Sequence, residues 1–148
     1  MTQSGNILII EGDASVRGIL DDCLTELGYQ VVAVANGKEG LDQVGSHCFD
    51  VVLVDLQIPN PYGLQVIAKL TEANPKLPIV AVSGHGILHD VVEAMRIGAW
   101  DHISIPIEDT DAVAVVIQRV LDKAALIAER DRYQYEIERL NRSLEVEV

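Results

Sequence analysis

Two short aliphatic runs, each followed by an acid, constrain the fold of this chain more than any other feature. Residues 7–10 read Ile-Leu-Ile-Ile, and residues 51–54 read Val-Val-Leu-Val. Such runs, rich in β-branched residues, are typical of strands buried on both faces of a parallel sheet. They lead directly into Glu11-Gly12-Asp13 and into Asp55. Since open parallel sheets bind ligands at the carboxyl ends of their strands, we expect a phosphate or divalent-metal site at this edge.

The whole chain alternates between strand and helix patterns. The predicted strands cover residues 7–10, 30–34, 51–54, 79–82 and 102–105. The predicted helices cover residues 15–27, a segment opened by Asn36-Gly37, and residues 64–70, 89–97 and 111–144. Five strands that are each followed by a helix predict a doubly wound α/β fold, with helices on both faces of a parallel sheet. The flavodoxin-like strand order 2-1-3-4-5 places strands one and three together at the switch point.

Composition and charge narrow the classes of partner. The 148 residues suffice for one domain with a largely aliphatic core. A net charge of −12 argues against direct binding of nucleic acid or of an anionic membrane. The N-terminus lacks a positive segment, and the apolar run after it is too short for a signal peptide. Cys23 and Cys48 form no CxxC pattern and are interpreted as small buried side chains in a reducing compartment. We therefore expect a cytoplasmic protein.

The last segment predicts a helix that extends beyond the domain. No Gly or Pro occurs between Asp111 and Leu144, and the first half has an apolar face suited to packing on the sheet. In the second half, one line of residues recurs at steps of four and three, as in a coiled coil with one polar member. This seam consists of Leu126, Arg130, Tyr133, Ile137, Leu140 and Leu144. We predict a domain over residues 1–122 and a coiled-coil-like helical extension over residues 123–148, which forms a homodimer or links to an output domain.

Several pieces of the sequence, in order and at the right spacing, resemble the receiver domain of bacterial two-component response regulators. They are residues 7–13, residues 52–59 with Gly63, residues 81–84, and residues 98–101 before Pro106. The resemblance covers about residues 6–122 and implies a CheY-like fold with a C-terminal helical linker. It also implies that a sensor histidine kinase or a phosphotransfer protein donates a phosphoryl group to Asp55 with the help of Mg²⁺. The expected chemistry is limited to self-phosphorylation from a phosphodonor and autodephosphorylation.

The resemblance also assigns the other site residues. Mg²⁺ prefers oxygen ligands in octahedral geometry. The family positions for these ligands correspond to the carboxylates of Glu11 and Asp55 and the backbone carbonyl of Gln57. Asp13 is a neighbouring candidate ligand, although its position before a helix also predicts an N-terminal cap. Ser83 corresponds to the hydroxyl that turns toward the phosphoryl group and signals its presence.

Three positions depart from the family pattern, which makes this an atypical receiver. Gly12 stands where the family usually has a second acid, so the Mg²⁺ site is expected to be weakened or lost. Ile105 stands where a lysine usually pairs with the phosphoryl group, and His102 stands where an aromatic residue is usual. Charged hydrogen bonds are worth roughly 1.5–3 kcal/mol each, so the loss of the lysine should weaken the phosphorylated form.

Two functions remain open on these grounds. The first is a phosphorylatable receiver that relays its state through the C-terminal helix. The second is a pseudo-receiver that acts as a protein–protein interaction module without phosphorylation, which Gly12 and Ile105 favour. A haloacid dehalogenase-type hydrolase needs an Asp two residues after Asp55, where Gln57 stands. A flavodoxin-type cofactor protein needs a Ser/Thr/Gly-rich loop after the first strand, which the sequence lacks.

Overall fold

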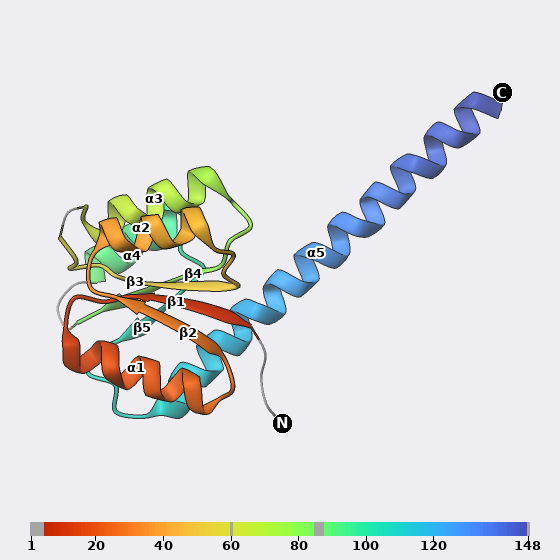
Figure 1. The fold of residues 1–148 in the computed structure, drawn as a ribbon. Helices are drawn as coiled ribbons and strands as arrows, with labels where there is room; N and C mark the ends of the chain where they lie inside the picture. The colour runs from red at the N-terminus through yellow and green to blue at the C-terminus, as the bar shows by residue number, and fades with distance from the viewer. Residues whose placement is uncertain (1–4, 60, 85–87, 148) are drawn as a thin grey trace.

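In the computed structural model, residues 5–59, 61–84 and 88–147 are described, and strands and helices alternate along them (Figure 1). The strands are β1 (Asn6–Ile10), β2 (Gln30–Val34), β3 (Val51–Asp55), β4 (Ile79–Ser83) and β5 (Asp101–Ser104). The helices are α1 (Ala14–Glu26), α2 (Gly37–Ser46), α3 (Gly63–Ala73), α4 (Leu88–Ile97) and α5 (Thr110–Glu147). Every predicted element is present, and its ends agree with the prediction to within a few residues.

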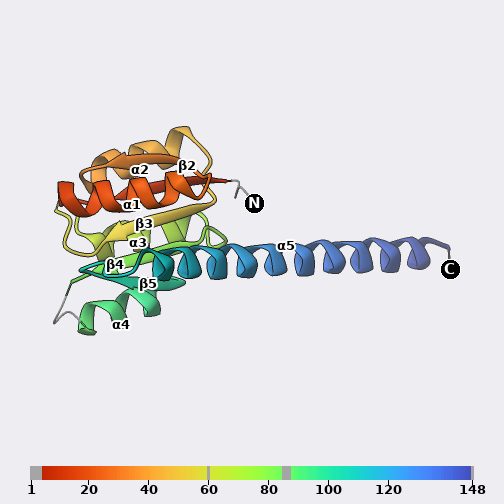
Figure 2. The same cartoon turned by 90° about the horizontal axis from the view of Figure 1, so that it is seen from below.

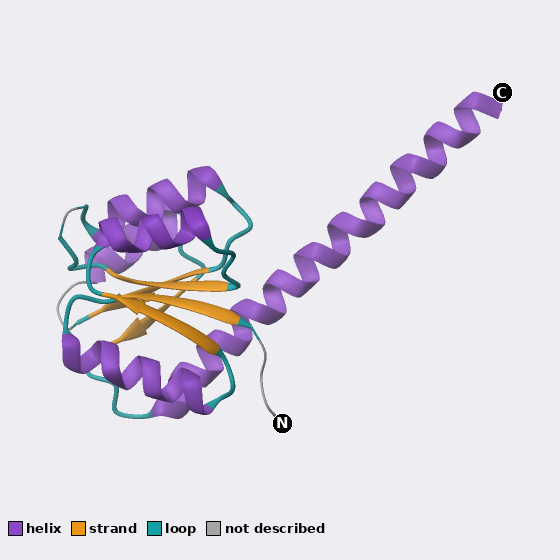
Figure 3. Ribbon diagram, in the orientation of Figure 1, coloured by secondary structure: helices purple, strands orange, loops and turns teal. Residues whose placement is uncertain are grey.

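The five strands form one parallel sheet in the order β2-β1-β3-β4-β5, as predicted (Figure 3). β1 lies between β2 and β3, and its register pairs Ile10 with both Val34 and Val54. The chain therefore leaves β1 and β3 at the same level of the sheet. Consequently, Glu11 follows β1 immediately beside Asp55, the last residue of β3.

Helices cover both faces of the sheet, which explains the continuous apolar runs. α1 and α5 lie on one face, and α2, α3 and α4 lie on the other (Figures 1 and 2). Ile7 and Ile9 belong to the apolar cluster on the α1/α5 face, whereas Leu8 and Ile10 belong to the cluster on the opposite face. All four side chains are fully buried. Alternate residues of one strand thus complete two separate cores.

Short polar side chains and glycine define several helix ends. The Asp13 carboxylate caps α1 by accepting hydrogen bonds from the backbone N–H groups of Ser15 (2.9 Å) and Val16 (3.2 Å), which confirms the predicted cap. Asn36 caps α2 in the same way, through the N–H of Glu39 at 2.9 Å. After α1, Gly28 adopts a φ of +100°, which allows the chain to turn back into β2.

Helix α5 begins inside the domain and continues well beyond it (Figure 2). Val113, Ile117 and Val120 are buried against the sheet, whereas most side chains after Ile127 are exposed. Within the described residues, no helix has the length and apolar character needed to cross a membrane.

The prediction for the cysteines was right for Cys23, which is buried, and wrong for Cys48, which is exposed. Cys48 lies in the loop after α2, outside both cores. Residues 81–84, one of the family motifs, are among the described residues, whereas residues 85–87, which follow them, are not.

Candidate functional site

Two acids lie side by side at the carboxyl edge of the sheet. Asp55 ends β3 and is 8% exposed, and Glu11 follows β1 and is 2% exposed. The Glu11 backbone N–H donates to the carbonyl of Val34 at 3.1 Å, which holds its backbone against β2. Burial of two neighbouring carboxyl groups is unusual in a protein core, because each charge loses its hydration. The arrangement points to a site for a positively charged or phosphoryl-containing ligand.

The electrostatics of Glu11 reflect this crowding. Burial and the neighbouring Asp55 carboxyl group together raise the pKa of the Glu11 carboxyl to about 8. One oxygen of Glu11, Oε1, accepts a hydrogen bond from the Asp13 backbone N–H at 3.2 Å. The other oxygen, Oε2, is buried and has no hydrogen-bond partner. Glu11 is therefore a buried acid with one unsatisfied oxygen beside a second acid.

Backbone N–H groups orient the Asp55 carboxylate. Oδ1 accepts from the N–H of Gln57 at 2.9 Å, and Oδ2 accepts from the N–H of Gly12 at 3.3 Å. Gly63, the first residue of α3, lies so close that a Cβ at this position would collide with the backbone of Asp55 and Leu56. The tight approach of α3 to the end of β3 thus fixes the loop that holds Asp55 and Gln57.

The remaining candidate ligands differ in their roles. Asp13 is exposed, and one of its oxygens already caps α1. A Cβ at Gly12 would lie 3.7 Å from both Asp55 Oδ2 and the carbonyl oxygen of Ala35, so the position has room for a side chain. Gln57 is exposed next to Asp55. In the described part of the chain, no three His, Cys, Asp or Glu side chains form a metal-binding group.

Ser83 and Ile105 lie at the same edge on the next two strands. Ser83 ends β4 and is buried, and it follows Val82, which pairs with Asp55. The N–H of Ile105 donates to the Ser83 carbonyl at 2.7 Å, which brings the end of β5 to the site. The Ile105 side chain, half buried, packs on the α1/α5 core. His102 is exposed on β5.

The residues present fit a divalent cation. Two carboxyl groups converge, one of their oxygens lacks a partner, and burial together with the neighbouring Asp55 raises the pKa of Glu11. A hard cation such as Mg²⁺ prefers this kind of oxygen donor and removes the repulsion between the two carboxylates. The room beside Gly12 leaves space for water in place of the second acid.

A parallel sheet of order 2-1-3-4-5, with paired acids on β1 and β3 and a hydroxyl on β4, defines a signalling receiver of the doubly wound class. A family model described as "Response regulator receiver domain" matches residues 7–124. The chain therefore belongs to the response regulator receiver family. Members of this family generally bind Mg²⁺ at the phosphorylation site.

Known regulators resemble the chain over this domain. The regulatory protein LuxO of Vibrio cholerae is 32% identical over 117 residues, which cover 79% of this chain and 26% of LuxO. The DNA-binding transcriptional regulator NtrC of Escherichia coli is 31% identical over 114 residues, which cover 77% of this chain and 24% of NtrC. The chain thus spans about a quarter of the length of these curated relatives.

Solved structures support the fold. NtrX of Brucella abortus, in complex with ADP, superposes with a TM-score of 0.84 at 24% identity, over 87% of this chain and 30% of NtrX. A CheY-like receiver domain protein of Methanospirillum hungatei gives a TM-score of 0.77 at 24% identity, over 83% of this chain and 98% of that protein. At this level of identity, the two structures establish the shared fold alone.

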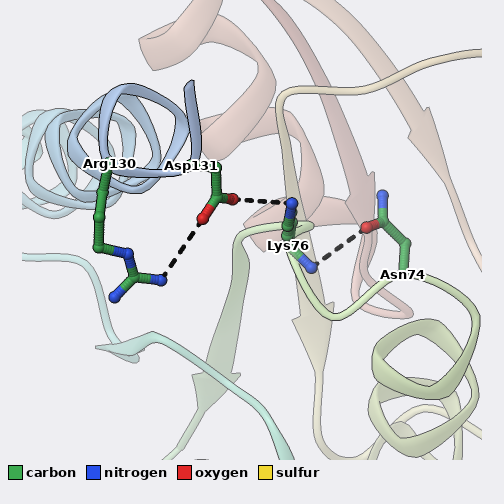
Figure 4. A network of polar contacts seen from close by, with 4 residues as sticks. All are labelled: Asn74, Lys76, Arg130 and Asp131. Atoms are coloured by element: carbon green, nitrogen blue, oxygen red, sulfur yellow. Dashed lines mark hydrogen bonds and ion pairs between the residues drawn. The ribbon is translucent and has the colours of Figure 1, made fainter. Parts of the chain in front are cut away.

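Some contacts that shape the site and the long helix had no signal in the sequence. The close approach of Gly63 to Asp55 becomes evident only in the folded loop. Asp131 on α5 pairs with Lys76 in the loop before β4, with 2.8 Å between Nζ and Oδ2 (Figure 4). The backbone N–H of Lys76 donates to the side chain of Asn74 at 3.1 Å, which orders this loop. The residues of the ion pair are far apart in the chain, so no local pattern links them.

Proposed function

We propose that Asp55 is the phosphoacceptor of this receiver. The observation that supports this most directly is the buried pair of Glu11 and Asp55 at the switch point, with one oxygen of Glu11 unpartnered. A buried carboxylate next to a second acid is a poor nucleophile until a cation balances the charge. A phosphoryl transfer site needs this combination of an oriented nucleophile and a place for a metal.

We propose that Mg²⁺ is held by the carboxylates of Glu11 and Asp55 and by the backbone carbonyl of Gln57. Asp13 remains a further candidate ligand through its second carboxylate oxygen. Bound Mg²⁺ would neutralise the oxygens of the incoming phosphoryl group and align them. The chain itself contributes the N–H groups of Gln57 and Gly12, which orient the Asp55 oxygens for attack.

The proposed reaction is a simple group transfer. An oxygen of Asp55 bonds to phosphorus as the bond from phosphorus to the histidine nitrogen of the donor breaks, and the imidazole leaves with its electron pair. In this proposal Ser83, at the end of the adjacent strand, donates its hydroxyl hydrogen to a phosphoryl oxygen. Attack of water on the resulting acyl phosphate returns Asp55 to its carboxylate form and releases phosphate.

The position of Ile105 supports the pseudo-receiver as a second candidate. Its side chain packs on the core and provides no positive charge for a phosphoryl group. A receiver without this charge gains less from phosphorylation, and partner binding alone then sets its state. The two candidates differ in one measurable property, which is whether Asp55 acquires a phosphoryl group.

We propose that residues 1–122 act as the receiver and that residues 123–148 act as a helical linker. The donor partner is a sensor histidine kinase or a phosphotransfer protein, and the state of Asp55 passes through α5 to an output domain or to a second copy of the chain. The relatives LuxO and NtrC, which extend far beyond the matched region, support the output domain. The cytoplasm is the proposed location.

Intact mass measurement tests the phosphoacceptor. The protein is incubated with Mg²⁺ and a small-molecule phosphodonor, beside Asp55→Asn, which keeps the size of the side chain and removes the nucleophile. The proposal predicts the gain of one phosphoryl group on the native chain only. Binding of beryllofluoride that depends on Mg²⁺ gives the same answer without covalent chemistry. No gain of mass and no beryllofluoride binding would favour the pseudo-receiver.

A further inference from the structure

The seam of α5 leaves a line of large apolar side chains exposed. We infer that, from Leu126 onward, it pairs with α5 of a second copy of this chain as a parallel two-stranded coiled coil. This inference deepens the proposed relay through α5 by naming the partner of the helix. Its test requires no phosphorylation, so the pairing and the phosphoacceptor role of Asp55 can fail separately.

The seam consists of large side chains that the domain leaves uncovered. All five of its apolar members are more than half exposed, and they are Leu126, Tyr133, Ile137, Leu140 and Leu144. Along this part of the helix there is a shallow, open and mostly apolar groove of about 460 Å³, which is lined by Leu126, Glu129, Arg130, Tyr133, Gln134 and Ile137. A groove between residues at steps of three and four is the kind of hole that accepts a side chain of a facing helix.

The domain uses other parts of α5. Asp131, which pairs with Lys76, is one residue from Arg130 and two from Tyr133. Because successive helical residues are rotated by about 100°, the Asp131 side chain points well away from the seam. The ion pair with Lys76 attaches α5 to the domain, and the other oxygen of Asp131 lies 3.8 Å from the guanidinium group of Arg130, the polar member of the seam (Figure 4).

On the N-terminal side of Leu126, the domain covers the residues that continue the seam along the helix. Arg119 and Lys123 precede Leu126 on this line by steps of four and three. Arg119 forms an ion pair with Asp101 at 2.5 Å, and the Lys123 ammonium lies 4.6 Å from the centre of the Trp100 ring. The line is thus held by the domain as far as Lys123, and its uncovered part begins at Leu126. A partner helix can start there without displacing the domain.

The charges beside the seam favour a second copy in parallel orientation. In heptad positions, Arg130 is at a and Glu129 is at g, so a parallel pair brings the two copies of Arg130 into one layer, where each also lies beside Glu129 of the other copy. The flanking g–e pairs are Glu129 with Gln134 and Glu136 with Asn141, which contain no like charges. In an antiparallel pair with the same overlap, Arg130 of one copy faces Leu140 of the other, and the two copies of Glu136 face each other. The charges beside the seam therefore favour the parallel orientation over the antiparallel one.

Sedimentation of the full chain over a range of concentrations tests the pairing. The native protein should form a reversible dimer, and Ile137→Asp, in the seam, should be monomeric throughout. Tyr135→Asp is the matched control, because Tyr135 is equally exposed on the same helix but lies off the seam. It should dimerise like the native chain. A native protein that stays monomeric, or equal loss of the dimer in both variants, would overturn the inference.

Disulfide capture tests the orientation. Leu126→Cys and Leu144→Cys are made separately in a Cys48→Ser background, since Cys48 is the exposed natural thiol. In a parallel pair, each variant crosslinks to itself on oxidation. The two positions are about 27 Å apart along the helix, so an antiparallel pair crosslinks only when the two variants are mixed. Crosslinks confined to the mixture would exclude the parallel arrangement.

Discussion

Among the buried polar residues, Glu11 is the least exposed. It is almost fully buried beside the Asp55 carboxyl group, and its side chain accepts a hydrogen bond from the backbone N–H of Asp13. Without a cation, a proton is the only species that can reduce the repulsion between the two acids. Protons and metal ions therefore compete for the same carboxyl pair.

The raised pKa of Glu11 predicts that the metal-free protein loses stability as the pH rises. The folded-state pKa of about 8 lies above the ordinary value of 4.5, so the folded protein holds this proton more tightly than the unfolded chain. The stabilisation is complete below about pH 4.5 and is lost as the pH rises through about 8. Urea unfolding in the presence of a chelator should show a decrease on the order of 1 kcal/mol or more.

The variant Glu11→Gln identifies the source of this pH dependence. Glutamine is neutral at every pH, so the variant should show a flatter profile than the native protein. Glu26→Gln, at an exposed position of α1, is the control and should retain the native slope. A native-like slope in Glu11→Gln would assign the effect to another group.

Gly12→Asp should restore the acid that the family pattern has at this position. The site has room, because the added Cβ meets its neighbours at ordinary contact distance and the backbone needs no positive φ. A further carboxylate should tighten Mg²⁺ binding by on the order of tenfold. Isothermal titration calorimetry measures the change, and Gly45→Asp adds the same charge at an open position near the end of α2. Equal tightening in both variants would indicate a general charge effect.

Ile105→Lys should restore the missing positive charge. The aliphatic part of lysine can keep the contacts of Ile105 with the core while its ammonium group reaches the site edge. A charged hydrogen bond worth roughly 1.5–3 kcal/mol corresponds to a roughly 10- to 100-fold gain in the affinity for beryllofluoride with Mg²⁺. Ile105→Met, of similar length but without charge, is the control. If lysine and methionine gave equal affinities, the position would not reach the phosphoryl group.

At the scale of elements, the contact between α3 and the end of β3 holds the site in shape. Gly63→Ala pushes a methyl group into the backbone of Asp55 and Leu56, neither of which can rotate away. We expect the free energy of unfolding to fall by about 1–3 kcal/mol and Mg²⁺ binding to weaken as the loop shifts. Gly45→Ala, in a helix with open space around it, should instead stabilise by about 0.5–1 kcal/mol. Native stability in Gly63→Ala would show that the loop yields easily.

The same elements show what the sequence could predict. The strands were recognisable because runs such as Ile7 to Ile10 are apolar on both faces, and α1 because Asp13 caps it. The meeting of Glu11 and Asp55 followed from the parallel strand order. The contact of Gly63 with Asp55 and the ion pair of Asp131 with Lys76 depend instead on backbone approach and on distant residues. No periodic pattern or motif in the sequence indicates these contacts, so only the folded chain shows them.

Across the whole molecule, charge is divided unevenly. Most of the net charge of −12 belongs to the domain as far as Leu121, whereas acidic and basic residues nearly balance along the helix beyond it. Two domain bodies repel one another over roughly the Debye length of 8 Å at physiological salt, while two helices of balanced charge do not. This distribution favours association through α5. The direction in which α5 leaves the domain therefore determines how two domains face each other.

The ion pair of Lys76 with Asp131 should fix this direction, and Lys76→Ala should release it. A hydrogen bond from Lys76 lowers the pKa of the Asp131 carboxyl, so the pair exists above that pKa and is lost as the pH falls through it. In the variant, the pKa of Asp131 should rise toward its ordinary value, and amide exchange should accelerate around residues 126–135. Carboxyl NMR titration measures the first effect. Glu93, whose pKa is lowered by Arg96 within α4, is the internal reference and should not change. An Asp131 pKa that does not respond to Lys76→Ala would show that this ion pair does not fix the direction of α5.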